Sequence, residues 1–145
     1  MNIKPANLTL RGFQDEEFAT FPKNYQAGKK GKISVSLDFG YDASERLIAC
    51  RASAEFIQEN KVYLICRLGG GFGISEESWN ERINKDKTHV IIERDLHIHI
   101  AMFVVGGLRG FLHARQQQSQ VAAFLGPVNI LELIGNSKFP LIPLQ

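Results

Sequence analysis

The spacing of the apolar residues changes once along this chain, and the change limits the folds that the chain can form. Between Leu8 and Leu68, apolar side chains recur mostly at every second position, which is the period of a β-strand. From about Ile91 to Arg115 they recur at every third or fourth position, which is the period of an α-helix. The sequence therefore predicts an α+β fold, in which a sheet comes first and helices follow.

The first part of the chain contains four strand-like segments. Lys32–Phe39 alternates most regularly and places Ile33, Val35 and Leu37 on one side of a half-buried strand. Residues that favour turns separate each segment from the next, so the pattern predicts a four-stranded antiparallel β-meander. The other strands are expected at residues 8–21, 45–56 and 61–68, with a kink at Gly12 in the first.

The last third of the chain is expected to hold one long and one short α-helix. The long helix ends near Arg115; residues 96–100 also alternate as a strand would, but the length of the segment favours a helix. The short helix begins at Pro127 and stops at Gly135. Before the long helix, residues 75–88 form either a short amphipathic helix or an exposed excursion.

Composition and charge describe an ordinary globular domain. The 145 residues are 44% hydrophobic and 22% charged, with a net charge of +2, which fits one domain with its own core. Acids are scattered among the bases, so no nucleic acid is expected as a partner. Residues 1–7 lack a secretory signal and no apolar stretch is long enough for a bilayer, which favours a cytoplasmic protein without membrane contact. A single domain is expected to cover residues 1–145, with a core at 8–134 and an extended tail at 135–145.

The two cysteines, Cys50 and Cys66, lie within apolar strand-like segments. They are expected to be buried thiols in a reducing compartment. A disulfide between neighbouring strands is the less favoured alternative. Neither cysteine lies in an electropositive motif that would favour a reactive thiolate.

No pattern of residues indicates catalysis. Gly69–Gly73 follows a strand, but acids come next and the Lys-Ser/Thr pair of a phosphate-binding loop is missing. A nucleophile, a base and an orienting group do not occur in any recognised spacing. The chain is therefore expected to be a binding protein without a cofactor, and not an enzyme.

His97 and His99 leave a second interpretation open. On a strand, two histidines at this spacing share a face and can begin a metal site. On a helix they point about 200° apart and belong to a polar face. No third ligand accompanies them, so no metal is expected. The alternative is a small metal- or ligand-binding α+β domain built on these two residues.

Gly106, Gly107 and Gly110 lie within the predicted long helix. Glycine inside a helix costs about 1 kcal/mol relative to alanine, so three of them call for a close approach by another element. In a short chain with one long helix, we expect that element to belong to another subunit. These glycines are therefore predicted subunit-interface residues.

The order of elements resembles that of the SecB family, bacterial chaperones that hold precursor proteins unfolded for export. Three local matches carry the resemblance. Gly71-Phe72-Gly73-Ile74 resembles the end of the family's fourth strand, and Arg109-Gly110 its Arg-Gly pair near the end of the first helix. Pro127–Leu133 is similar to the Pro-Val-Asn-Phe-x-x-Leu motif that opens the second helix, with Ile130 in place of the phenylalanine. The resemblance covers roughly residues 8–134.

The resemblance implies a homotetramer, arranged as a dimer of dimers, that binds unfolded or precursor polypeptides in apolar grooves. In that family the second strand and the short helix supply the groove walls. The client-binding residues that it implies for this chain are Ile33, Val35, Leu37, Phe72, Ile130, Leu133 and Ile134.

The resemblance also implies a partner on the sheet. Carboxylates there meet the basic tail of the translocase motor SecA in that family, and Asp15, Glu16 and Glu17 would supply them here. However, Arg67 lies near a position where a carboxylate is expected, and the net charge is positive. A SecB-like chaperone attached to a toxin–antitoxin pair fits these departures at least as well. A third possibility is a scaffold that only assembles.

Overall fold

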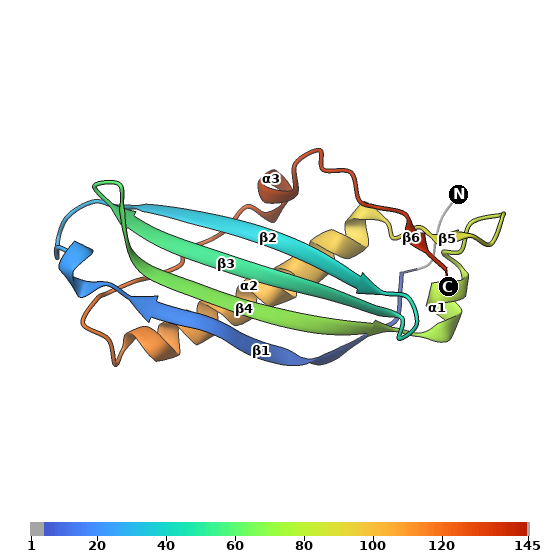
Figure 1. Ribbon diagram of the computed structural model, residues 1–145, viewed down its shortest axis with the longest axis horizontal. Helices are drawn as coiled ribbons and strands as arrows, with labels where there is room; N and C mark the ends of the chain where they lie inside the picture. The colour runs from blue at the N-terminus through green and yellow to red at the C-terminus, as the bar shows by residue number, and fades with distance from the viewer. Residues whose placement is uncertain (1–4, 145) are drawn as a thin grey trace.

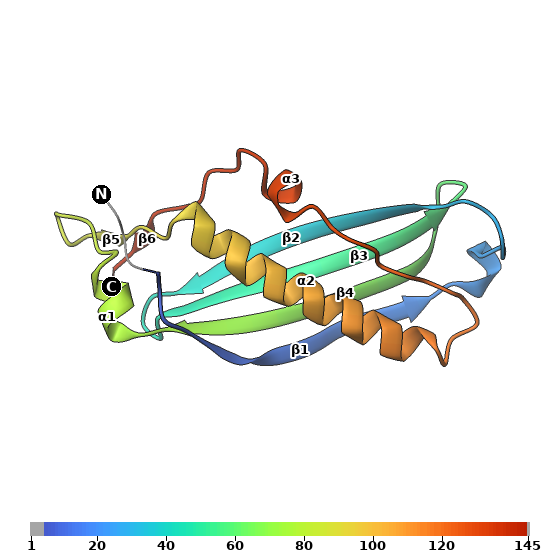
Figure 2. The same ribbon diagram turned by 180° about the vertical axis from the view of Figure 1, so that it is seen from behind.

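The protein folds into two layers, a twisted antiparallel sheet and one long helix that crosses a single face of it (Figures 1 and 2). This computed structural model describes residues 5–144. The first four residues, on which the expected lack of a signal partly rests, and the last residue of the tail lie outside the described residues. The four main strands are β1 (Leu8–Thr20), β2 (Lys32–Asp42), β3 (Leu47–Gln58) and β4 (Lys61–Ile74), and the long helix is α2 (Arg94–Gln116).

The antiparallel sheet and the helices after it confirm the predicted α+β fold, but the strand order differs in part from a meander. Strands β2, β3 and β4 follow one another as expected, whereas β1 pairs with β4, which gives the order β1-β4-β3-β2. Strands β1 and β2 are therefore the two edges. The kink expected at Gly12 is present, since the register of β1 against β4 shifts between Leu10 and Gly12.

The core lies between the sheet and α2. Side chains of β3 and β4 that point to the helix are buried, because α2 packs mainly on these two central strands. Strand β3 contributes Ile48, Cys50, Ala52, Ala54 and Phe56, and α2 contributes Leu96, Ile100, Val104, Leu108 and Leu112. By length and composition α2 could also span a membrane. Its apolar side, however, fills this core, which is the pattern of a core helix.

Residues 75–88 contain a short helix, so the first of the two expected alternatives holds. Helix α1 (Glu76–Asn80) begins after Ser75, whose side chain accepts a hydrogen bond from the Ser78 amide at 3.2 Å. Trp79 is only 4% exposed. A 3₁₀ turn, η1 (Pro22–Asn24), follows β1 in the loop expected there.

The short helix α3 (Ile130–Ile134) starts later than predicted. Asn129 caps it by accepting a hydrogen bond from the Glu132 amide at 3.1 Å, so Pro127 lies outside the helix. The end is as predicted, because Gly135 adopts a φ of 54°, which favours glycine.

The tail is extended, as expected, but it also closes the fold. Strand β6 (Ile142–Pro143) pairs with β5 (His89–Val90), and Ile142 is 5% exposed. The core therefore continues beyond residue 134, which corrects the predicted boundary.

Both cysteines are free and buried. Cys50 lies opposite Gly70 and Cys66 opposite Ala54, so the two thiols are not neighbours across a strand pair and the disulfide alternative is wrong. Burial raises the pKa of each thiol to about 12, which makes them unreactive at neutral pH.

Candidate functional site: an apolar strip beside strand β2

Ile33, Val35 and Leu37 share the helix-facing side of β2, as the alternation predicted. Each lies opposite a buried residue of β3 in the register of the two strands. Because β2 is an edge strand and α2 lies over the centre of the sheet, this side of β2 is only partly covered. Ile33 is 45% exposed, while Val35 and Leu37 are half-buried against the core.

Helix α3 lies alongside β2 on the same side of the sheet as α2 (Figure 2). Its side chains divide into three groups. Ile130 and Leu133 are half-buried, and Leu131 is 59% exposed. Ile134, by contrast, is 4% exposed and belongs to the interior.

Two of the predicted client-binding residues therefore do not line an open surface. Phe72 is 2% exposed because it lies on the central strand β4 and points under α2, where its ring is 6.2 Å from that of Phe103. Ile134 is buried because the last turn of α3 faces the core. The five other predicted residues remain at the surface, and the structure adds Leu131, which was not predicted. We name these six residues the apolar strip: Ile33, Val35, Leu37, Ile130, Leu131 and Leu133.

Beyond Leu37, the same side of β2 is occupied by an aromatic cluster around His97. The imidazole is fully buried, and Phe139 of the tail stacks on it with ring centroids 3.6 Å apart and planes 9° apart. Phe39 meets the same imidazole edge-on at 4.9 Å. Sequence reasoning missed Phe139, because one aromatic in an extended tail carries no periodic signal.

Both ring nitrogens of His97 have partners within the fold. Nδ1 lies 3.0 Å from the carbonyl oxygen of Glu93, which can only accept, so Nδ1 carries the proton. Nε2 then accepts from the Tyr41 hydroxyl at 2.6 Å. Burial lowers the pKa of His97, and the hydrogen bond to the Glu93 carbonyl and the Glu93 carboxylate oppose this only in part. His97 is thus a neutral core histidine.

This arrangement bears on the alternative metal site. His97 and His99 lie on a helix, so they point in different directions, and His99 is exposed beside Phe103. Within residues 5–144, no group of three or more histidine, cysteine or acidic side chains is placed to hold a metal. The geometry of His97 and His99 does not fit a shared metal ion.

The opposite face of the sheet is polar and carries two of the three predicted partner-binding acids, Glu16 and Glu17. Asp15 lies opposite the buried Leu68 on β4, so it belongs to the helix-facing side of the sheet and not to this face. Glu16 forms an ion pair with Arg51, and Glu17 forms one with Arg67, which lies directly opposite it on β4. Glu55 lies 3.8 Å from the same Arg67. Arginines therefore offset most of the acidic charge on this face.

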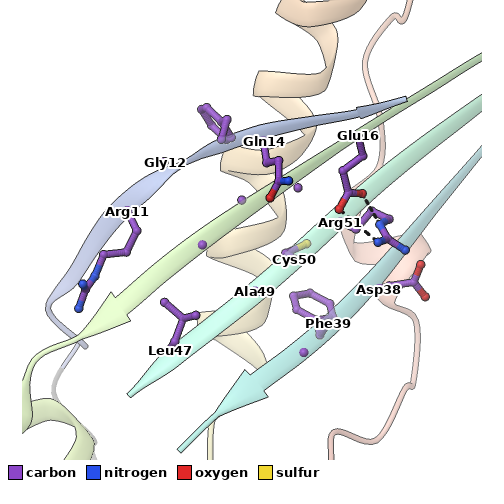
Figure 3. A pocket seen from close by; sticks show the side chains of 15 residues that line it. Arg11, Gly12, Gln14, Glu16, Asp38, Phe39, Leu47, Ala49, Cys50 and Arg51 are labelled. Carbon is purple, nitrogen blue, oxygen red and sulfur yellow. Dashed lines mark hydrogen bonds and ion pairs between the residues drawn. The ribbon is translucent and has the colours of Figure 1, made fainter. Parts of the chain in front are cut away.

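A shallow hollow of about 600 Å³ lies on this outer face (Figure 3). It exists because glycines of β4 and Ala49 of β3 supply little or no side chain to its floor. Arg11 and Leu47 lie at one end, and the Glu16–Arg51 pair with Asp38 lies at the other. The hollow carries charges of both signs and is not an acidic surface.

The three predicted interface glycines separate into two kinds. A Cβ on Gly107 would lie 2.8 Å from Leu68 Cδ2 and 2.9 Å from Phe13 Cζ, so this glycine lets α2 approach its own sheet. Among residues 5–144, a Cβ on Gly106 or Gly110 would meet nothing within 4 Å. The assignment of Gly107 to a subunit interface is therefore corrected: its contact lies within the chain.

Arg109, part of the motif quoted above, fastens the segment that follows α2. Its Nε donates to the Leu125 carbonyl at 3.0 Å, and its Nη2 donates to the Gly126 carbonyl at 3.1 Å. This contact directs the chain back along α2 toward α3. Arg109 thereby positions one wall of the apolar strip.

Comparisons with known proteins bear on the fold. No family model matches the sequence, and no curated protein is significantly similar to it. Among solved structures, one that is similar is the Mycobacterium tuberculosis SecB-like chaperone Rv1957, solved in complex with a ChAD peptide from the Rv1956 HigA1 antitoxin. The TM-score is 0.55 at 8% identity, and the match covers 84% of this chain and 88% of that one.

The fold is SecB-like. A protein of unknown function from Streptococcus agalactiae also matches, with a TM-score of 0.45, 9% identity and coverage of 85% of this chain and 99% of that one. At identities this low, the likeness speaks for the fold and not for the site.

Proposed function

We propose that this protein is a SecB-like chaperone that binds non-native polypeptides along the apolar strip. The observation that carries the proposal is the partial exposure of large apolar side chains from two elements on one side of the sheet, Ile33 of β2 and Leu131 of α3. The SecB-like fold supports it, as does the polypeptide bound to the similar mycobacterial protein.

The energetics suit weak and reversible binding of extended chains. Each apolar side chain that a client buries contributes about 1.5–3 kcal/mol, and much of this is offset by ordering the client. Tight holding then requires several strips that act together on one chain, which a homo-oligomer supplies. The exposed glycine face of α2, with Gly106 and Gly110, is the surface we propose for such assembly. Catalysis and a cofactor form no part of this function, and we propose a cytoplasmic location.

The outer face favours one kind of partner over the other. A basic tail such as that of the translocase motor needs unpaired carboxylates, yet Glu16 and Glu17 are ion-paired with arginines. We therefore propose that the protein acts as a chaperone for a toxin–antitoxin pair or for other clients, and that it does not bind SecA.

The test is the suppression of aggregation. A client protein diluted from denaturant should stay soluble with the purified protein, and Ile33→Asp or Leu131→Asp should weaken this protection several-fold, because a carboxylate at either position must be desolvated when the client binds. Both positions are exposed, so the variants should fold. Ser36→Asp is the matched control, since it adds the same charge to the opposite, polar side of β2.

The outcome is read beside circular dichroism and native mass. Full protection by folded Ile33→Asp and Leu131→Asp would remove the apolar strip as the binding surface. An equal loss of protection in Ser36→Asp would show that a charge on β2 reduces protection without acting at the apolar strip.

A further inference from the structure

The carboxyl-terminal segment, residues 136–144, folds back over the side of β2 that carries the apolar strip. Its start is held by Arg94 of α2, which donates to the carbonyl of Gly135. From there it runs past the amino-terminal end of α2 to β5, as Figures 1 and 2 show. The tail therefore packs on the same side of the sheet, and against the same strand β2, as the apolar strip.

Phe139 is the side chain that the tail places on β2. Its ring stacks on His97 and meets the Phe39 ring edge-on, with centroids 5.8 Å apart. Phe39 and Leu37 point to the same side of β2, because residues two apart on a strand share a face. Phe139 therefore occupies the direct continuation of the apolar strip.

The tail is held at two points and loosely between them. The second anchor is Ile142, which is 5% exposed and lies in the two-residue β5–β6 ladder. Leu144 adds one further hydrogen bond, from its amide to the Thr88 carbonyl at 2.8 Å. The other side chains of the segment are largely exposed, namely Asn136, Ser137, Lys138, Pro140 and Leu141.

We propose that the tail is a built-in competitor, in which Phe139 fills the aromatic continuation of the apolar strip until an aromatic side chain of a client displaces it. The inference rests on the proposed function. A bound client would take the place of Phe139 against His97 and Phe39, and would continue along β2 to Ile33. Displacement has a modest cost, because few backbone hydrogen bonds hold the segment.

The test measures binding of a fluorescein-labelled unfolded peptide that contains one phenylalanine among aliphatic residues, followed by anisotropy. Phe139→Ser should bind this peptide more tightly, on the order of tenfold, because the apparent dissociation constant falls as the open fraction rises. Leu141→Ser is the matched control: it removes an apolar side chain that is 54% exposed from the same segment, and it should leave affinity unchanged.

A second measurement needs no variant. Hydrogen exchange of the Leu144 amide in the wild-type protein should accelerate when the peptide saturates it, since displacement of Phe139 loosens the tail. Unchanged or weaker binding by folded Phe139→Ser, or a Leu144 amide that the peptide leaves equally protected, would overturn the inference.

The two proposals fail in different ways. Suppose the wild-type protein binds the peptide, but Phe139→Ser does not bind it more tightly and the Leu144 amide exchanges at an unchanged rate. The proposal of a competing tail is then wrong, and the chaperone function stands. If neither wild-type nor Phe139→Ser binds the peptide or protects a client from aggregation, both are wrong.

Discussion

Replacing Gly106 by alanine should stabilise the protein, whereas the same replacement at Gly107 should not. The two residues are neighbours on α2, so the gain in helix propensity is the same for both, about 1 kcal/mol. At Gly106 the new methyl group meets nothing within 4 Å in the part of the chain that the structure describes, so the full gain should appear. In a protein of this size, that corresponds to a rise in the unfolding midpoint of about 3 °C.

At Gly107 the methyl group collides with the sheet. It would lie 2.8 Å from Leu68 Cδ2 and 2.9 Å from Phe13 Cζ, whereas carbon atoms pack best about 3.5–4.0 Å apart. Phe13 is 45% exposed and can move aside, but Leu68 is 2% exposed and cannot. Overpacking costs about 1–3 kcal/mol, which cancels or exceeds the helix gain. Gly107→Ala should thus be less stable than Gly106→Ala by about 1–3 kcal/mol.

The assay is urea unfolding followed by the fluorescence of Trp79, the single tryptophan, which is buried. Equal stability of the two variants would refute the packing of α2 on β1 and β4 described above. The measurement is repeated over a range of protein concentrations. If a second subunit packs on Gly106, that variant should lose its gain at concentrations where the oligomer forms.

The remaining predictions concern titratable and ion-paired groups that differ in burial. Because the pKa of His97 is lowered by burial, the unfolded chain takes up a proton more readily than the folded one, so the free energy of unfolding should decrease as pH falls below about 6.5. Urea unfolding between pH 8 and pH 5 should show a smaller decrease in His97→Gln, and equal slopes would contradict the assignment. Removing the carboxylate in Glu93→Ala should cost about 3 kcal/mol, because it strips a bidentate partner, at 2.7 and 2.6 Å, from the fully buried Arg82 side chain. Removing Glu16, whose partner Arg51 is half-exposed, should cost much less, because water screens the pair. Similar losses at both sites would show that burial of the pair does not matter.

The residues that point into the core could be predicted from the sequence wherever apolar residues recur at every second position without interruption. Alternation identified the inner faces of β2 and β3, and it placed Ile33, Val35 and Leu37 together. Alternation assigns a side of the sheet to each residue but says nothing about which strand lies beside which. For that reason the pairing of β1 with β4 across the chain was not predicted.

The exposed fraction of a side chain was predicted less well than the side of the sheet to which it points. Phe72 and Ile134 were expected on an open groove, but their burial depends on where α2 crosses and how α3 turns, which are tertiary facts. Phe139 had no sequence signal, since an isolated aromatic in a proline-containing tail fits an exposed segment equally well. The three helical glycines were expected to allow a close approach by another element. The structure shows such an approach at Gly107, where the neighbouring element is the sheet of the same chain.

The charged side of the sheet decides how molecules of this protein can meet at high concentration. Stacking a second sheet there would dehydrate the guanidinium groups of Arg51 and Arg67 together with their carboxylate partners, and dehydration costs several kcal/mol for each ion. The adjacent edge strand β1 is interrupted twice in its register, which spoils it as a template for another strand. This face of the sheet and the β1 edge therefore resist sheet stacking and strand addition between molecules.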